Sequence, residues 1–169
     1  MTMQGLDPQA GDGQSETMNV MRHTIPAAAL ALGLAGLIPF VGGALGLWFR
    51  LPLIGPEDAL KLVTVYGAII LSFLGGIRWG TAIGPYDSRR QTFEFSLSVA
   101  GSLAGLLACF LEAVPSLTLL IAGFLMQALW DVTSVEAGRL PSWFGKLRMV
   151  LTAGAVLSLI AALLAVVVT

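Results

Sequence analysis

The stretch YGAIILSFLGGIRWG, Tyr66 to Gly80, combines the three features on which the fold prediction depends. It is apolar over most of its length, it contains small residues at short intervals, and it carries one arginine, Arg78. A charged side chain is costly inside hydrocarbon, so an ionisable residue in such a run is a candidate for a specific role. The stretch therefore predicts a membrane-spanning helix with a polar site near its end.

The whole chain has the composition of a membrane protein. Of its 169 residues, 56% are hydrophobic and 11% are charged, whereas a soluble domain carries about 25% charged residues. The net charge of -1 indicates no bulk electrostatic partner, and no nucleic acid is expected. One cysteine, Cys109, and one histidine, His23, exclude an intrachain disulfide and a zinc or bis-histidine haem cluster. No cofactor and no metal site are therefore predicted.

Five apolar runs predict an all-α integral membrane protein, a bundle of five transmembrane helices. Each run is long enough to cross about 30 Å of hydrocarbon as a helix. The predicted helices cover residues 27–49, 60–84, 92–111, 114–131 and 146–168. The transmembrane domain is then residues 25–169, and the polar tail before it, residues 1–24, is predicted to be disordered.

The distribution of lysine and arginine predicts the orientation of the bundle. The N-terminal tail and the second and fourth loops lie on one side and carry Arg22, Arg89, Arg90, Arg139, Lys146 and Arg148. The other side carries Arg50 and Lys61. By the positive-inside rule the N-terminus faces the cytoplasm and the C-terminus faces the opposite side. The acidic tail is unlike a mitochondrial transit peptide, and the expected location is the bacterial inner membrane.

Small residues recur at helix-packing intervals in two of the predicted helices. The second helix carries Ser72, Gly76 and Gly80 four residues apart, and the third carries Gly101 and Gly105. Small side chains let two backbones approach closely, which is how helices associate inside a membrane. The favoured interpretation is tight packing within the bundle. The alternative is a surface for a partner subunit.

Pro39 lies inside the first apolar run. Proline removes a backbone donor and frees the carbonyl of Ala35. Because membrane helices tolerate such breaks, the sequence predicts a simple kink. The alternative interpretations are a hinge or a free carbonyl that lines a cavity.

Four ionisable residues, Arg78, Glu94, Asp131 and Arg148, are predicted at one membrane level. Gln127 and Asp131 are four residues apart and share a helix face. One hypothesis pairs Arg78 with Asp131, with Gln127 as a further partner, because a guanidinium binds a carboxylate bidentately. The alternatives are an Arg78 side chain that snorkels to the headgroups, or a site for a substrate or a lipid headgroup.

Tryptophans near the predicted helix ends suggest contact with the membrane interface. Trp79, Trp130 and Trp143 are predicted interfacial anchors. The fourth loop combines Trp143 and Phe144 with basic residues such as Lys146. Such a segment is typical of an ordinary positive-inside loop, and recognition of an anionic lipid is the alternative.

Several stretches resemble the transmembrane-protein-69-like family, which consists of small multi-span proteins of bacteria and mitochondria. These stretches are LGLAGLIPF in the first helix, YGAIILSFLGGIRWG in the second, Asp131 at the end of the fourth, and LPSWFGKLRMVLT entering the fifth. The resemblance runs from about Gly33 to Thr152, and its most specific motif is in the second helix. It implies a multi-span membrane protein and no established activity.

The expected function is a non-enzymatic accessory or assembly partner of a larger membrane complex. Its expected partners are the lipid bilayer, a membrane protein or a second copy of the chain, and an anionic lipid. The alternative is a small transporter, or a protein that binds an anionic lipid or small anion through the polar cluster. An enzyme is not expected, because the spans contain no serine–histidine pair and arginines near Glu94 and Asp131 would keep both carboxylates ionised.

Overall fold

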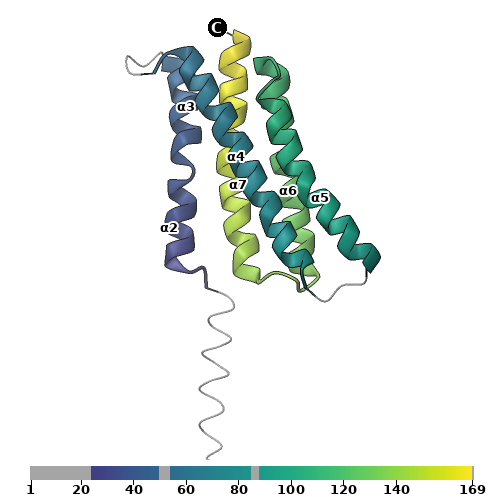
Figure 1. Ribbon diagram of the computed structural model, residues 1–169. Coiled ribbons are helices and arrows are strands. Elements are labelled where there is room, and N and C mark those ends of the chain that lie inside the picture. The colour runs from purple at the N-terminus through teal and green to yellow at the C-terminus, as the bar shows by residue number, and fades with distance from the viewer. Residues whose placement is uncertain (1–23, 50–53, 85–87, 169) are drawn as a thin grey trace, which may run out of the picture.

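The computed structural model describes residues 24–49, 54–84 and 88–168, and these form long helices that lie side by side (Figure 1). Apart from Thr24, the predicted disordered tail lies outside the described residues. The helices are α2 Ala27–Ala35, α3 Ile38–Phe49, α4 Pro56–Ala82, α5 Ser88–Ala108, α6 Ala113–Glu136 and α7 Ser142–Val168.

Four segments of the described chain are long and apolar enough to cross a membrane. They are Ala27–Phe49, which comprises both α2 and α3, then Pro56–Ala82, Ala113–Glu136 and Ser142–Val168. The prediction of an all-α membrane bundle is confirmed. Helix α5 is not among the four, because Arg89, Arg90 and Glu94 make its first half polar. A fifth span at residues 92–111 stays a prediction, as does the direction of the bundle in the membrane.

The first span is broken where the sequence predicts a kink. Helix α2 ends at Ala35 and α3 begins at Ile38, one residue before Pro39. The break leaves the carbonyl of Gly36 outside the helical ladder, and the Tyr66 hydroxyl donates a hydrogen bond to it at 3.0 Å. A side chain from α4 therefore satisfies a backbone group that the kink exposes.

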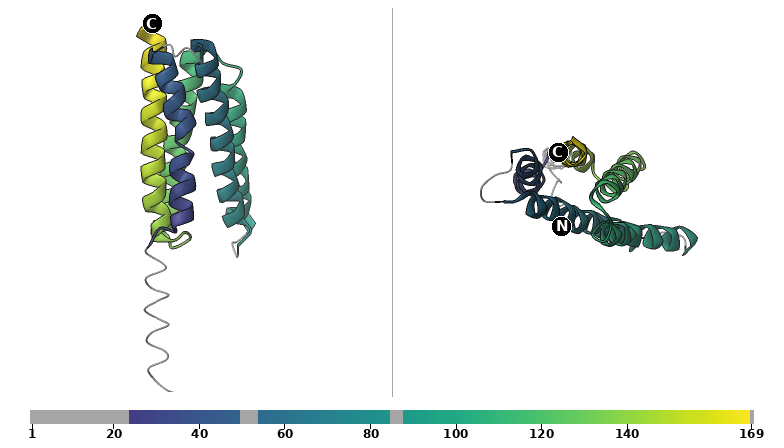
Figure 2. Two further views of the ribbon diagram at one scale, coloured as in Figure 1. Left: turned by 90° about the vertical axis from the view of Figure 1, so that its left-hand side faces the viewer. Right: turned by 90° about the horizontal axis from the view of Figure 1, so that it is seen from above.

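The helices pack against one another in specific pairs. Helix α4 packs along α5 and α6 along α7, while α3 packs against both α4 and α7 (Figure 2). Helix α2 packs mainly against α7. Helices α2, α5 and α7 begin, and α4 and α6 end, at one end of the bundle (Figure 1). We call this the charged end, because Arg78, Glu94, Asp131 and Arg148 all lie toward it.

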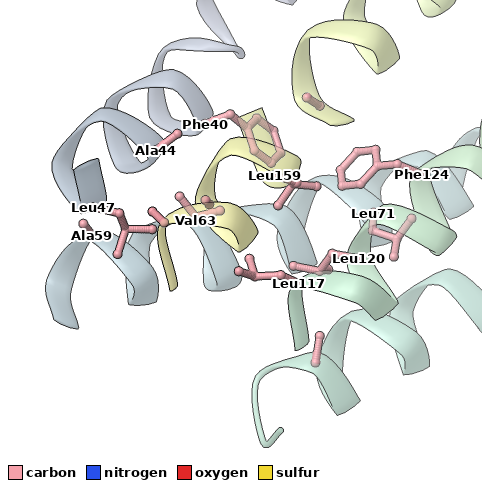
Figure 3. Packing of buried hydrophobic residues seen from close by; sticks show 14 of the residues in the cluster. Phe40, Ala44, Leu47, Ala59, Val63, Leu71, Leu117, Leu120, Phe124 and Leu159 are labelled. Atoms are coloured by element: carbon pink, nitrogen blue, oxygen red, sulfur yellow. The ribbon is translucent and has the colours of Figure 1, made fainter. Parts of the chain in front are cut away.

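An apolar core fills the space between α3, α4, α6 and α7. Phe40 of α3, Phe124 of α6 and Leu159 of α7 are buried and face one another (Figure 3). The rings of Phe40 and Phe124 meet edge to face, with their centroids 5.6 Å apart, a geometry that aromatic pairs favour. Many apolar side chains elsewhere are exposed, among them Leu32 and Phe73. An apolar surface of this kind is suited to lipid.

Small residues bring α4 and α5 into backbone contact. A Cβ on Gly101 would lie 3.1 Å from the carbonyl oxygen of Leu71, and one on Gly105 would lie 2.9 Å from that of Ala68. On the opposite helix, a Cβ on Gly75 would collide with the carbonyl oxygen of Ser98. These glycines are therefore the residues that allow the two helices to approach.

The glycines predicted for packing on α4 are only partly those that pack. Ser72 lies at the contact, where its hydroxyl is 2.9 Å from that of Ser102. Gly76 and Gly80, however, are exposed, and no described atom lies within 4 Å of a Cβ built on either. Residues four apart drift by about 40° per step around a helix. A stripe at strict intervals of four therefore leaves the interface, and Gly75 takes the place predicted for Gly76.

Helices α6 and α7 extend further at the charged end than predicted. Helix α6 continues to Glu136 rather than ending at Asp131, and α7 begins at Ser142 rather than near residue 146. The connection between them is a tight turn in which Gly138 has a φ of 70°, a conformation that favours glycine. Asp131 and Arg148 therefore lie inside helices instead of at their ends.

Candidate functional site: two buried ion pairs

All four predicted ionisable residues are buried within the charged end. Arg78, Glu94, Asp131 and Arg148 lie four to six residues from the nearest end of their helices, or about 6 to 9 Å at 1.5 Å per residue. Each is at most 8% exposed. A buried charge requires a partner, and the structure provides one for each of the four.

Arg78 pairs with Glu94 across the contact between α4 and α5. The Nε atom of Arg78 lies 3.3 Å from Oε2 of Glu94. The same carboxylate oxygen accepts a hydrogen bond from the indole Nε1 of Trp130 at 3.0 Å. The Arg78 guanidinium also lies over the Trp130 ring, 4.3 Å from its centroid, where the face of the ring attracts the cation. The three side chains therefore contact one another across α4, α5 and α6, although Arg78 Nε itself makes no hydrogen bond among the described residues.

Asp131 pairs with Arg148 across the contact between α6 and α7. The Nε atom of Arg148 donates a hydrogen bond to Oδ2 of Asp131 at 2.6 Å. Asp131 is 1% exposed and Arg148 is 7% exposed. This short bond between opposite charges ties the last two helices together close to their connecting turn.

The predicted pairing of Arg78 with Asp131 is therefore wrong, because each residue has a different direct partner. Glu94 is the nearest carboxylate to Arg78, since the glycines of the α4–α5 contact bring the two helices close together. Asp131 still acts on Arg78 through its charge, as does Arg139. Snorkelling does not describe Arg78 either, because its side chain is buried under Trp130.

Gln127 lies in the same buried region, one turn before Asp131. It is 8% exposed, and its side-chain amide donates to the carbonyl of Leu74 at 3.4 Å. It therefore connects α6 to α4 at the depth of the ion pairs. The prediction made Gln127 a partner of Arg78, whereas its side chain contacts the carbonyl of Leu74.

The three tryptophans predicted as interfacial anchors have different environments. Trp79 is 48% exposed and its ring lies against that of Phe95, as expected of a side chain at the membrane interface. Trp143 is half-buried beside Phe144. Trp130 is 9% exposed and belongs to the ion-pair cluster, so the prediction of an anchor is wrong for Trp130.

Sequence reasoning missed three members of this site. The first is Trp130, in its role as a hydrogen-bond donor. The second is Arg139, whose Nη2 donates to the hydroxyl of Ser134 at 2.9 Å. The third is Thr152, whose buried hydroxyl lies one turn after Arg148. The spacing of Arg148 and Thr152 signals a shared helix face. Nothing in the sequence distinguishes Trp130 from an interfacial tryptophan.

The cluster joins the four helices α4 to α7 and carries a small surplus of positive charge. Among the described residues, its buried or half-buried charges are three arginines, at 78, 139 and 148, and two carboxylates, at 94 and 131, which leaves +1. Within the described residues no three His, Cys, Asp or Glu side chains form a group that could hold a metal ion. The chemistry available is ion pairing and the binding of an acceptor or anion.

Apolar spans, an exposed apolar surface and a buried ionic cluster together define a multi-pass all-α membrane protein. The chain belongs to the family described as protein of unknown function (DUF3429), whose model matches residues 25–164. It is 38% identical over 166 residues to transmembrane protein 69 of Xenopus tropicalis. The match covers 89% of this chain and 62% of that relative. The resemblance to the transmembrane-protein-69-like family is confirmed, and no solved structure matches the chain.

Proposed function

We propose that the protein is a non-enzymatic accessory or assembly partner of a larger complex in the bacterial inner membrane. On this proposal it holds a helix of another membrane protein, or of a second copy of itself, against the exposed face of α4. The observation that carries the proposal is the pair of exposed glycines, Gly76 and Gly80, four residues apart on α4.

This pair of glycines has the spacing of a membrane helix-association site. Two glycines four residues apart let a second helix approach the backbone of the first, and such pairs recur where transmembrane helices meet. Gly76 and Gly80 are exposed, and a Cβ on either would meet no described atom within 4 Å. Their side of α4 therefore has room for a closely packed helix.

The buried charges support a structural role rather than a catalytic one. General acid–base catalysis requires a group that can exchange protons with a substrate. Each buried carboxylate of the charged end lies against an arginine, and Glu94 is also held by Trp130. These contacts lock α4 to α7 together and give the exposed face of α4 a rigid support.

A small transporter has weaker support. Arg78 and Arg148 would be the groups that bind an anion, but each already faces a carboxylate within the bundle. Moving an anion past them would require both pairs to open. The binding of a lipid-like molecule requires no such opening, because an apolar cavity lies next to Arg148.

The proposal is tested by changing the glycine face alone. In membranes solubilised with a mild detergent, we expect the tagged chain to migrate on a native gel in a complex larger than the free chain. The double variant Gly76→Leu with Gly80→Leu should migrate as the free chain, because two leucines block the close approach of a helix.

The matched control is Gly42→Leu on α3, since a Cβ at Gly42 also meets no described atom within 4 Å. This variant should keep the complex. If the double variant keeps it too, or if the wild-type chain migrates alone in several mild detergents, the proposal fails. Fractionation of the source membranes tests the proposed location separately.

A further inference from the structure

A cavity of about 400 Å³ lies between α2, α4 and α7 in the half of the bundle toward the charged end. Its deep end is lined by Phe40, Tyr66 and Phe124, and Leu32 and Phe73 line its margin. The last two side chains are 75% and 66% exposed, so the cavity borders the lipid-facing surface. Its volume falls within the range of about 300 to 1,000 Å³ that is typical of small-molecule sites.

The kink in the first span accounts for this cavity. Helix α3 packs against both α4 and α7, whereas α2, beyond the break at Gly36, packs mainly against α7. The space between α2 and α4 is therefore not closed by direct helix contact. On α7 the cavity extends from Phe144 to Ala155, or about 16 Å along the helix axis.

The cavity has one polar end, formed by Arg148 and Thr152. Both residues line it, and they are 7% and 5% exposed. The Nε atom of Arg148 is used by Asp131, but Arg148 Nη2 and Thr152 Oγ1 have no hydrogen-bond partner among the described residues. Buried polar atoms without partners are rare and cost free energy. Two of them, one turn apart on α7, indicate a place where a ligand supplies the missing acceptors.

The charge of the surroundings indicates what those acceptors are. Arg148 Nη2 is a donor that cannot accept a hydrogen bond, and the Thr152 hydroxyl can donate as well. The surplus of +1 at the charged end favours an anionic group over a neutral one. An anion placed here would also leave the pair between Arg148 and Asp131 intact, because that pair uses a different nitrogen of the guanidinium.

We propose that this cavity binds an anionic amphiphile. Its hydrocarbon chain lies between α2 and α4 against the aromatic side chains, and its headgroup oxygens accept hydrogen bonds from Arg148 Nη2 and the Thr152 hydroxyl. The headgroup is a carboxylate or a phosphate, supplied either by a free fatty acid or by an anionic membrane lipid. The ligand enters from the bilayer past Leu32 and Phe73. The site is separate from the Gly76–Gly80 face and does not depend on it.

Native mass spectrometry of the full chain tests this proposal directly. The detergent-purified protein is mixed with equimolar oleate, methyl oleate, phosphatidylglycerol and phosphatidylcholine, and the mass of each adduct identifies what is bound. We expect one adduct of oleate or phosphatidylglycerol per chain. Adducts of methyl oleate should be about tenfold weaker or more, because it has no anionic oxygen and charge-assisted hydrogen bonds are the stronger ones. Phosphatidylcholine should bind more weakly than phosphatidylglycerol, because its choline cation is repelled by the positive surplus of the charged end. Oleate alone identifies a fatty-acid site, and phosphatidylglycerol identifies a membrane-lipid site.

Two variants and one matched control locate the site without disturbing the ion pairs. Ala29→Phe fills the cavity from α2 and should abolish the adduct, whereas Ala28→Phe, one residue earlier, exposed and outside the lining, should retain it. Thr152→Val keeps the side-chain shape and should weaken the adduct about five- to tenfold. Equal binding of oleate and methyl oleate, or full binding by Ala29→Phe, would overturn the proposal.

Discussion

The two ion pairs at the charged end differ in how completely their polar atoms are used. The carboxylate of Glu94 receives Arg78 and the indole of Trp130, and the ring of Trp130 covers the guanidinium. The pair between Asp131 and Arg148 is shorter, yet Asp131 Oδ1, Arg148 Nη2 and Thr152 Oγ1 have no partner among the described residues. Arg78 Nε of the first pair also makes no hydrogen bond among the described residues. The two pairs therefore differ in degree: the second, together with Thr152, leaves more buried polar atoms for a ligand.

The largest effect should follow from breaking the second pair. Asp131→Asn leaves the Arg148 charge buried and without a carboxylate in direct contact. The free energy of unfolding should fall by about 3 to 5 kcal/mol, the loss typical of a buried pair that loses one partner. The free energy of unfolding in mixed micelles measures this loss. Asp58→Asn, at an exposed residue in the first turn of α4, serves as the control and should cost less than about 1 kcal/mol. Similar losses for the two variants would mean that the buried pair does not hold the helices together.

A smaller effect is expected at the first pair. Glu94→Gln removes a charge but keeps an oxygen that can accept from Trp130, and Arg78 keeps the aromatic face and the more distant charge of Asp131. We expect a loss of about 1.5 to 3 kcal/mol in the same assay, the range for a hydrogen bond to a charged group. A loss greater than that of Asp131→Asn would reverse the comparison between the two pairs.

The smallest effect is expected for Thr152→Val. Because the Thr152 hydroxyl has no hydrogen-bond partner among the described residues, its removal from the ligand-free protein should change the free energy of unfolding by less than about 1 kcal/mol. The same variant should bind the amphiphile less well. A large loss of stability without ligand would indicate that the hydroxyl already has a structural partner, and would remove it from the proposed site.

Much of the fold was predictable because it depends on local patterns. Long apolar runs predict helices wherever backbone groups have no water to bind, and the kink at Pro39 follows from its missing donor. Helix α4 begins at Pro56, four residues before the predicted start at residue 60. Its local signals are Pro56 in the first turn, followed by Glu57 and Asp58, which complement the helix dipole. The polar residues of the charged end were likewise recognisable as a group from the level at which each helix places them.

The pairing within that group was not predictable from helix positions alone. Arg78 and Asp131 were matched because they lie at one level, but the side of the helix on which each charge lies depends on the neighbouring helices. Because residues four apart are offset around the helix, Gly76 and Gly80 face outward, and Gly75 lies at the contact with α5. That contact places Glu94 beside Arg78, so these two residues form one ion pair. Asp131 then pairs with Arg148 instead.

The sequence by itself determined that this chain crosses a membrane as helices, and that its few buried charges gather at one end. Composition and periodicity carry that information because the cost of exposing charge or backbone to hydrocarbon acts residue by residue. Only the tertiary structure decided which charge meets which, where Trp130 lies, and that a cavity opens beside Arg148. These features depend on the rotation of each helix and on the distance between helices, which are set by packing between residues far apart in the chain.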